Sequence, residues 1–215
     1  MSTFPNSPRI LKAGLALIDP GSGRVQRMIS LQYNPDSLSR SLQVQGEGAE
    51  GGQRAEPLRL KGPAIETIKL EAEIDATDQL EFPDQNPDAV QFGIQPQLAA
   101  LESLVNPTSG QLLMNNAQIM NGTLEIAPME APLALFVWGR SRVVPVRVTE
   151  FSITEEAFDT SLNPIRAKLS LGLRVLTVED FPLGHRGAGL FLSGLQATEQ
   201  LAIKAVGGVL SALGI

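Results

Sequence analysis

Period-two alternation of apolar and polar residues is the strongest pattern along the chain. It runs over residues 11–17 and again over 25–33, with Asp19-Pro20-Gly21-Ser22-Gly23 between the two runs. Two alternating runs joined by turn residues predict a β-hairpin. Asn34-Pro35-Asp36 ends the second strand, because proline cannot donate to a β-ladder. A third strand is expected around residues 39–45, with Leu42 and Val44 facing the core.

A clean strand follows at 68–75, where Ile68, Leu70, Ala72 and Ile74 alternate with Lys69, Glu71, Glu73 and Asp75. This pattern predicts one buried face and one wet, acidic face. The flanking stretches 46–63 and 76–95 show no periodicity and are expected to be long loops. Residues 97–105 predict one flanking amphipathic helix, and 107–131 is expected to contain turns.

The second half of the chain predicts three further strands. Residues 133–138 are apolar on both faces, which is typical of a central strand. Valines alternate over 144–148 and the phase slips at Glu150, so we expect a β-bulge or a sharp bend there. Residues 167–175 predict a longer strand that carries Arg166, Lys168 and Arg174 together on its polar side.

These elements predict a mainly β fold: an antiparallel β-barrel or sandwich, since many strand edges need partners. We expect this domain to span residues 1–182. The period changes to helical from about residue 189, so 183–215 is expected to be a C-terminal amphipathic helical tail. Its predicted apolar face comprises Leu195, Thr198, Leu201, Ala202, Ala205, Val209 and Leu213. The tail is rich in small residues and needs a surface to lie on.

Composition removes several classes of function. The 215 residues include no cysteine and one histidine, and the net charge is −6. Disulfides, thiol nucleophiles and cysteine or multi-histidine metal sites are therefore excluded. The acidic balance argues against nucleic-acid binding. The start of the chain lacks a signal-peptide pattern and no apolar run is long enough to span a bilayer. We expect an intracellular protein that is not an enzyme, binds no cofactor and does not insert into a membrane.

The few candidates for chemistry are weak. His185 lies in a Gly-flanked junction, without the context of a nucleophile, and is interpreted as a linker or interface residue. Asp75, Asp78 and Asp84 do not match the ligand spacing of a calcium loop. The glycines of 46–52 lie beside two glutamates that would repel phosphate, and no helix follows them.

A glycan hydrolase using a carboxylate pair is a remote alternative. The available pairs are Glu155 with Glu156 and Glu71 with Glu73. Neighbouring residues on a strand point to opposite faces, which disfavours the first pair. The second pair shares a face, but that face belongs to a wet strand.

Charge is unevenly placed along the chain. Eight acidic residues and only one lysine lie in 66–88, whereas 138–178 holds six basic residues. These sets are either solvated sheet faces or complementary surfaces. In the second interpretation, the strand with Glu71, Glu73 and Asp75 in one copy contacts the strand with Arg166, Lys168 and Arg174 in the next. Opposite patches on one chain are what a ring-closing interface requires.

Two stretches resemble a known family. One is Leu31-Gln32-Tyr33-Asn34-Pro35-Asp36-Ser37-Leu38. The other begins at Leu135-Phe136-Val137-Trp138-Gly139 and continues through Phe158 to Asn163-Pro164-Ile165-Arg166-Ala167. In this order they resemble the tube-like domain of contractile injection systems, in particular the baseplate protein that joins the spike hub to the inner tube. Asn163 stands where the family commonly has glycine, and the apolar tail replaces the LysM module that often follows.

The resemblance implies a structural subunit that forms a homo-hexameric baseplate ring, with its sheets lining a channel. Its implied partners are the spike or hub protein, the inner-tube protein and other baseplate components, in a phage-tail-like particle that assembles in the cytoplasm. Tyr33, Phe136 and Trp138 would anchor the core, and Asn34-Pro35 and Asn163-Pro164 would shape turns. The loop 46–63 and the tail 190–213 would contact neighbouring rings. The alternative within the same machine is an inner-tube or tube-end cap subunit.

Overall fold

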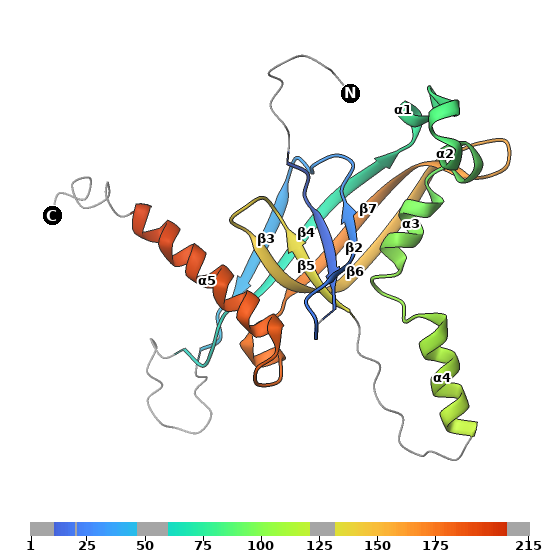
Figure 1. The fold of residues 1–215 in the computed structure, drawn as a ribbon. Coiled ribbons are helices and arrows are strands. Elements are labelled where there is room, and N and C mark those ends of the chain that lie inside the picture. The colour runs from blue at the N-terminus through green and yellow to red at the C-terminus, as the bar shows by residue number, and fades with distance from the viewer. Residues whose placement is uncertain (1–10, 20, 47–59, 121–131, 206–215) are drawn as a thin grey trace.

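The body of the protein is one seven-stranded antiparallel sheet with the strand order β2-β1-β5-β6-β7-β4-β3 (Figure 1). The computed structural model describes residues 11–19, 21–46, 60–120 and 132–205. The strands are β1 (Gly14–Ile18), β2 (Val25–Ser30), β3 (Leu38–Gln43), β4 (Ile65–Asp75), β5 (Leu133–Val137), β6 (Val143–Phe158) and β7 (Pro164–Val175). The mainly β, antiparallel prediction is therefore confirmed.

Helical segments connect and extend the sheet. They are α1 (Thr77–Leu80), the 3-10 turn η1 (Pro83–Gln85), α2 (Pro87–Phe92), α3 (Gln95–Glu102), α4 (Ser109–Met120), the 3-10 turn η2 (Val178–Asp180) and α5 (Arg186–Ala205). The expected flanking helix at 97–105 is α3, and it begins two residues earlier than predicted. The expected helical tail is α5.

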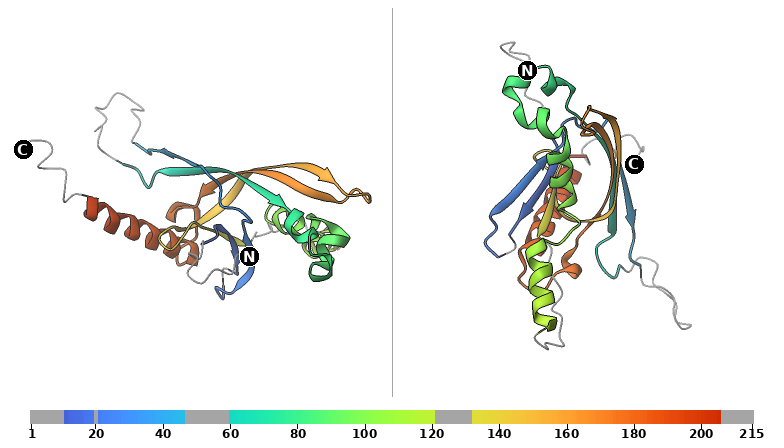
Figure 2. Two further views of the ribbon diagram at one scale, coloured as in Figure 1. Left: turned by 90° about the horizontal axis from the view of Figure 1, so that it is seen from above. Right: turned by 90° about the vertical axis from the view of Figure 1, so that its right-hand side faces the viewer.

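The sheet folds over itself around one core. Figure 2 shows β1 and β2 lying at an angle to the long strands β4, β6 and β7, so that the two halves face each other. Leu15 and Leu31 from the first half pack in the same buried cluster as Leu70 and Leu171 from the second. Phe136, on the strand β5 that lies between the two halves in the sheet, belongs to the same cluster. Because each such side chain contributes roughly 1.5–3 kcal/mol when buried, this shared cluster stabilises the fold-over.

The strands β1 and β5 are buried on both faces. Leu15 and Leu17 face the main core, whereas Ile18 and Leu133 form a second cluster on the opposite side. Phe181 and residues of α5, including Leu190, pack against that second cluster. The apolar run 133–138 is thus a central strand as predicted, and the C-terminal helix lies against a surface at its first turns.

Alternation along β6 and β7 follows the predicted pattern. The register of β6 against β7 shifts between Val148 and Glu150, which confirms the expected bulge. On β7, Ala167 and Leu169 are buried between more exposed neighbours. The polar side of β7 is therefore available for the charged face described below.

Two stretches expected to lack regular structure contain helices. Residues 76–95 hold α1, η1 and α2, and residues 107–120 hold α4. The short helices are held by tertiary contacts that local sequence does not reveal, such as the bond from the N–H of Ile94 to the carbonyl of Pro164, 2.9 Å long. The loop 46–63 falls mainly on residues 47–59, outside the described residues, as do Val209 and Leu213 of the predicted helix face.

The expectation that Leu42 and Val44 face the core is wrong. These side chains are 55% and 68% exposed. The reason is their place in the sheet: β3 is an edge strand, and Leu42 pairs with Glu66, one residue beyond the part of β4 that pairs with β7. Alternation on β3 therefore does not correspond to a buried face.

Candidate assembly surface

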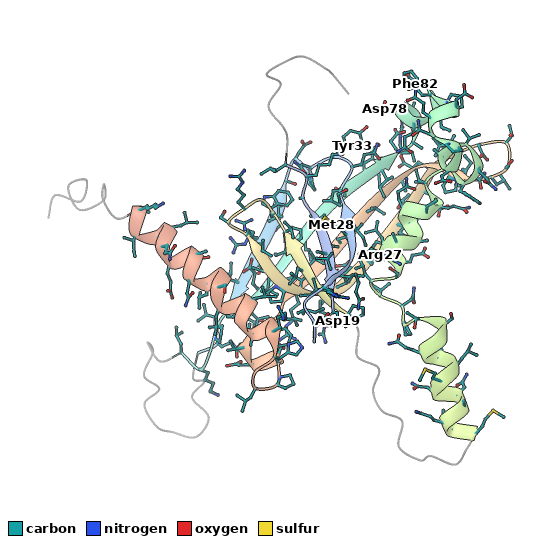
Figure 3. All side chains as sticks on the ribbon, in the orientation of Figure 1. Asp19, Arg27, Met28, Tyr33, Asp78 and Phe82 are labelled. Carbon is teal, nitrogen blue, oxygen red and sulfur yellow. The ribbon has the colours of Figure 1, made fainter. Side chains whose placement is uncertain are left out.

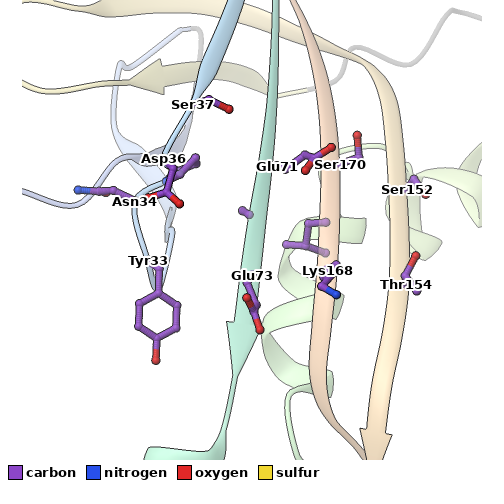
Figure 4. Close-up of a pocket in the computed structure, with 13 residues that line it drawn as sticks. Tyr33, Asn34, Asp36, Ser37, Glu71, Glu73, Ser152, Thr154, Lys168 and Ser170 are labelled. Atoms are coloured by element: carbon purple, nitrogen blue, oxygen red, sulfur yellow. The ribbon is translucent and has the colours of Figure 1, made fainter.

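The polar face of β4, β7 and β6 gathers most of the charged residues that the sequence singled out. Register places Glu73 beside Lys168 and Asp75 beside Arg166. The same register places Lys168 beside Thr154 on β6. Glu73, Lys168 and Thr154 line a groove of about 560 Å³ whose other wall is the turn after β2 (Figure 4). The face is thus a mixed acidic and basic surface within one chain.

Ion pairs join neighbouring strands across this face. The Nε atom of Arg166 lies 2.7 Å from Oδ2 of Asp75 and 3.5 Å from Oε1 of Glu73. Lys168 Nζ lies 2.9 Å from Oε1 of Glu156 on β6. The basic side chains of β7 are therefore partly neutralised by acidic side chains of β4 and β6 within the same chain. The sequence suggested Glu156 only as a member of a possible catalytic carboxylate pair, and its role in an ion pair with Lys168 was not predicted.

Asp75 is the most constrained carboxylate of the set. Partial burial raises its pKa, but hydrogen bonds from the hydroxyl and N–H of Thr77, together with the Arg166 guanidinium, hold the pKa below its ordinary value. Asp75 in turn raises the pKa of Arg166, and Glu156 raises that of Lys168. The charged forms of these groups are favoured in the folded state.

The remaining two predicted interface residues lie apart from this cluster. Glu71 is exposed two residues along β4, opposite Ser170. Arg174 lies near the end of β7, where its Nη2 donates to Oδ1 of Asp180 over 2.8 Å. Asp180 also caps η2 by accepting from the N–H of Thr177. Arg174 is therefore tied to the connection toward α5 rather than to the acidic strand.

The turn after β2 is built around Asn34. Its Oδ1 accepts from the N–H of Ala13 over 2.9 Å, and its Nδ2 donates to the carbonyl of Leu11 over 2.8 Å. The Asn34 side chain thereby forms the hydrogen bonds that a neighbouring strand would form with the residues just before β1. Pro35 follows Asn34 in the turn. Tyr33 is 49% exposed, so the expectation that it anchors the core is wrong: it lines the groove instead.

Gln32 completes the same turn, and sequence patterns gave no sign of its role. Its side-chain amide forms hydrogen bonds with both the carbonyl and the N–H of Asp75. This pairing links the end of β2 to the end of β4. One wall of the groove is thereby fixed to the strand that carries Glu73.

The second motif stretch forms the centre of the sheet. Phe136 is 1% exposed, and its ring stacks with that of Trp138 at a centroid distance of 5.8 Å. Gly139 adopts a positive φ of 80° in the turn that follows. Phe136 and Trp138 therefore lie in and against the core, as their apolar strand led us to expect.

Asn163-Pro164 shapes the β6–β7 hairpin. The side-chain Nδ2 of Asn163 donates to Oδ2 of Asp159 over 2.8 Å and to the carbonyl of Gln91 over 3.2 Å. Pro164 is buried, and its carbonyl accepts from Ile94. The hairpin tip is thus fastened to α2. Asp159, four residues before Asn163, is the turn partner that the sequence analysis did not single out.

The described residues offer little for catalysis. Among them, no group of three or more His, Asp or Glu side chains is arranged to hold a metal ion. His185 stacks on Phe181 at 4.7 Å, and its Nδ1 accepts from the N–H of Gly187. Within the described part of the chain, no helix is long and apolar enough to cross a membrane. The carboxylate pairs considered for a hydrolase belong to the ion-paired face or its neighbours.

Comparison with known proteins finds a family match over most of the chain. The family described as "Contractile injection system tube protein" matches residues 18–179, from the end of β1 to η2. No curated protein matches the chain. A solved structure described as "Tail of empty GTA particle computed with helical refinement, C6 symmetry" is similar at 13% identity and a TM-score of 0.31, over 76% of this chain and 90% of that chain.

Proposed function

The chain belongs to the contractile injection system tube protein family, and we propose that it forms the baseplate ring that joins the spike hub to the inner tube. In this role one face of a homo-hexameric ring contacts the hub and the other presents a template for the first tube ring. The inner-tube protein and other baseplate components are the further partners. Assembly would take place in the cytoplasm, and the product is a part of a phage-tail-like particle.

The observation that carries this proposal is an addition to the family domain. The matched region ends at residue 179, and α5 begins at Arg186. The helix packs on the sheet through its first turns and then projects away from it (Figure 1). Its outer turns expose Leu201 and Ile203, the latter at 73%. An adaptor needs a second attachment in addition to the tube-type domain, and an exposed apolar helix suits a protein partner.

This division supports the proposed domain organisation. Residues 1–182 would form the ring-building domain, and 183–215 the tail that engages a neighbouring ring or the hub. In such a ring the polar face of β4, β6 and β7 would line the channel. A surface of mixed charge is hydrated, which suits a passage that other molecules move through.

The contact predicted between the acidic strand of one copy and the basic strand of the next would involve fewer residues than the sequence suggested. Asp75 pairs with Arg166, and Arg174 with Asp180, inside the chain. Glu71 forms no ion pair with another described residue, and Lys168, although paired with Glu156, keeps an exposed ammonium, so these two groups are the best placed to reach a second copy. Like other exposed pairs, they would contribute about 1 kcal/mol or less each.

Deletion and counting of copies test the adaptor role. Particles that lack this chain are expected to have baseplates without tubes, or tubes of irregular length. Quantitative mass spectrometry of intact particles should find one ring's worth of copies, beside many copies of the tube protein. Full-length tubes on normal baseplates after deletion would overturn the proposal.

The family description itself favours a second candidate, a subunit of the inner tube or its end cap. The same count separates the adaptor from an inner-tube subunit, and the position in the particle separates it from a tube-end cap. An inner-tube subunit would be present in many copies that increase with tube length, whereas the adaptor number is independent of length. A tube-end cap would be present once per ring position but at the end opposite the spike.

A further inference from the structure

One end of the molecule is an acidic tip with exposed apolar side chains. It consists of α1, η1, α2 and the β6–β7 hairpin turn, held together by the bonds of Asn163 and Pro164 described above. Phe82, Val90 and Leu162 are exposed there, and Figure 3 shows Phe82 and Asp78 at the outer end. Exposed apolar side chains gathered at one end of a molecule are typical of an interface.

The charge around these apolar residues is of one sign. Asp78, Glu81, Asp84 and Asp88 are exposed, and none has an ion-pair partner within the described residues. No lysine or arginine occurs anywhere in residues 70–139, which contain ten acidic residues. The partner of this tip must therefore supply positive charge.

The turn between β5 and β6 supplies positive charge in a fixed geometry. Arg140 is exposed and Arg142 is half-buried, and neither forms an ion pair with another described residue. The turn is closed by the N–H of Trp138, which donates to the carbonyl of Arg142 over 2.8 Å. Arg140 and Arg142 thus form a compact basic surface, which we call the arginine turn.

These two surfaces cannot meet within one molecule. The arginine turn precedes Val143 and the hairpin of the acidic tip follows Phe158, so they lie at opposite ends of the 16-residue strand β6. A strand of that length spans roughly 50 Å when straight, far beyond the reach of an arginine side chain. The complementary charges can only be matched between copies.

We infer that the acidic tip of one copy binds the arginine turn of a second copy, head to tail. Such a contact is heterologous, and it closes into a ring when its rotation permits. The inference rests on the proposed function only in that the ring is made of copies of this chain. In this arrangement the main charge contact between copies does not involve the polar sheet face, because the charged residues there already form ion pairs within the chain.

Charge exchange tests this contact in the purified full-length chain by analytical ultracentrifugation. The tip variant replaces Asp78, Glu81, Asp84 and Asp88 by lysine, and the turn variant is Arg140→Glu with Arg142→Glu. Each alone should associate at least about tenfold more weakly than wild type, because like charges then meet. An equimolar mixture should regain association, since tip and turn become complementary in alternating copies. Combining the tip and turn substitutions in one chain should also restore it.

A matched control carries Glu199→Lys and Lys204→Glu on α5, and should associate like wild type. Association should weaken in about 1 M salt, where the screening length is only about 3 Å. The inference is overturned if wild type stays monomeric, if either variant associates like wild type, or if the mixture stays apart. None of these outcomes affects the deletion and counting experiments, so failure of the contact and failure of the adaptor role are distinguishable.

Discussion

The side-chain amide of Gln32 pairs with the backbone of Asp75 in both directions. Nε2 of Gln32 donates to the carbonyl over 2.6 Å, and Oε1 accepts from the N–H over 2.9 Å. This is the hydrogen bonding of a β-ladder, supplied by a side chain between the end of β2 and the end of β4. It fastens the two halves of the folded sheet, which otherwise contact each other mainly through apolar side chains.

Replacing Gln32 by alanine should therefore destabilise the fold, by about 2 kcal/mol for two hydrogen bonds at about 1 kcal/mol each. The measurement is the free energy of unfolding from urea denaturation. Gln26→Ala is the matched control, because Gln26 is exposed on β2. Equal stabilities of the two variants would show that the amide bonds do not hold the halves together.

The carboxylate of Asp75 predicts a pH dependence that is separate from its backbone pairing. Its pKa is lowered from 3.8 by the bonds from Thr77 and Arg166, which outweigh the effect of burial. The charged form thus stabilises the fold above pH 3.8, and this contribution is lost as the pH falls through the lowered pKa.

Asp75→Asn should accordingly lower the free energy of unfolding at pH 7, by about 1 kcal/mol, and have less effect at an acidic pH below the lowered pKa, where the wild-type carboxyl is protonated as well. Glu71→Gln serves as the control, since Glu71 forms no ion pair with another described residue. A loss for Asp75→Asn that is the same at both pH values would mean that charge is not the cause.

Truncation of two aromatic residues of the motif stretches should change the stability of the protein by very different amounts. Phe136→Ala removes a side chain that is almost fully buried and should cost about 3–5 kcal/mol. Tyr33→Ala removes an exposed ring and should change stability by no more than about 0.5 kcal/mol. Phe136→Leu keeps the measurement possible if the alanine variant does not fold. A large loss for Tyr33→Ala would contradict its place in the groove.

The parts of the fold that could be predicted are those in which one buried face dictates the pattern. Ile68 to Ile74 and Ala167 to Val175 alternate because one side of each strand packs in the core. The bulge at Glu150 was visible as a phase slip for the same reason. The motif residues Phe136 and Trp138 were found because a central strand is apolar on both faces.

The parts that could not be predicted depend on partners distant in sequence. The helix α4 contains no charged residue and buries none of its side chains, so no packing against the sheet imposes a helical pattern on its sequence. The short helix α2 is held by Asn163, 72 residues from its partner Gln91. The sequence showed opposite charges on two strands, but only the pairing of β4 with β7 shows that they neutralise each other within the chain.

Two glycines near the start of α5 test how this helix is attached. A Cβ on Gly187 would overlap the ring of Phe181, whereas a Cβ on Gly189 would meet no atom within 4 Å. Gly187→Ala should therefore displace the Phe181 ring or the helix and destabilise the protein. Gly189→Ala should stabilise it by up to about 1 kcal/mol, through helix propensity. Thermal unfolding measures both, and equal shifts would contradict the close packing at Gly187.

The exposed end of α5 separates folding from assembly. Leu201 and Ile203 contact solvent in the isolated chain, so replacing both by serine should leave the free energy of unfolding within about 0.5 kcal/mol of wild type. If the helix attaches the ring to a neighbouring component, the same variant should be depleted from purified particles, because burying serine hydroxyls in an apolar contact is costly. Leu113→Ser with Met114→Ser on α4 is the control, with two equally exposed apolar residues on another helix. Normal incorporation of the α5 variant would assign the attachment to another surface, whereas loss with both variants would show that exposed apolar residues are needed generally rather than at α5.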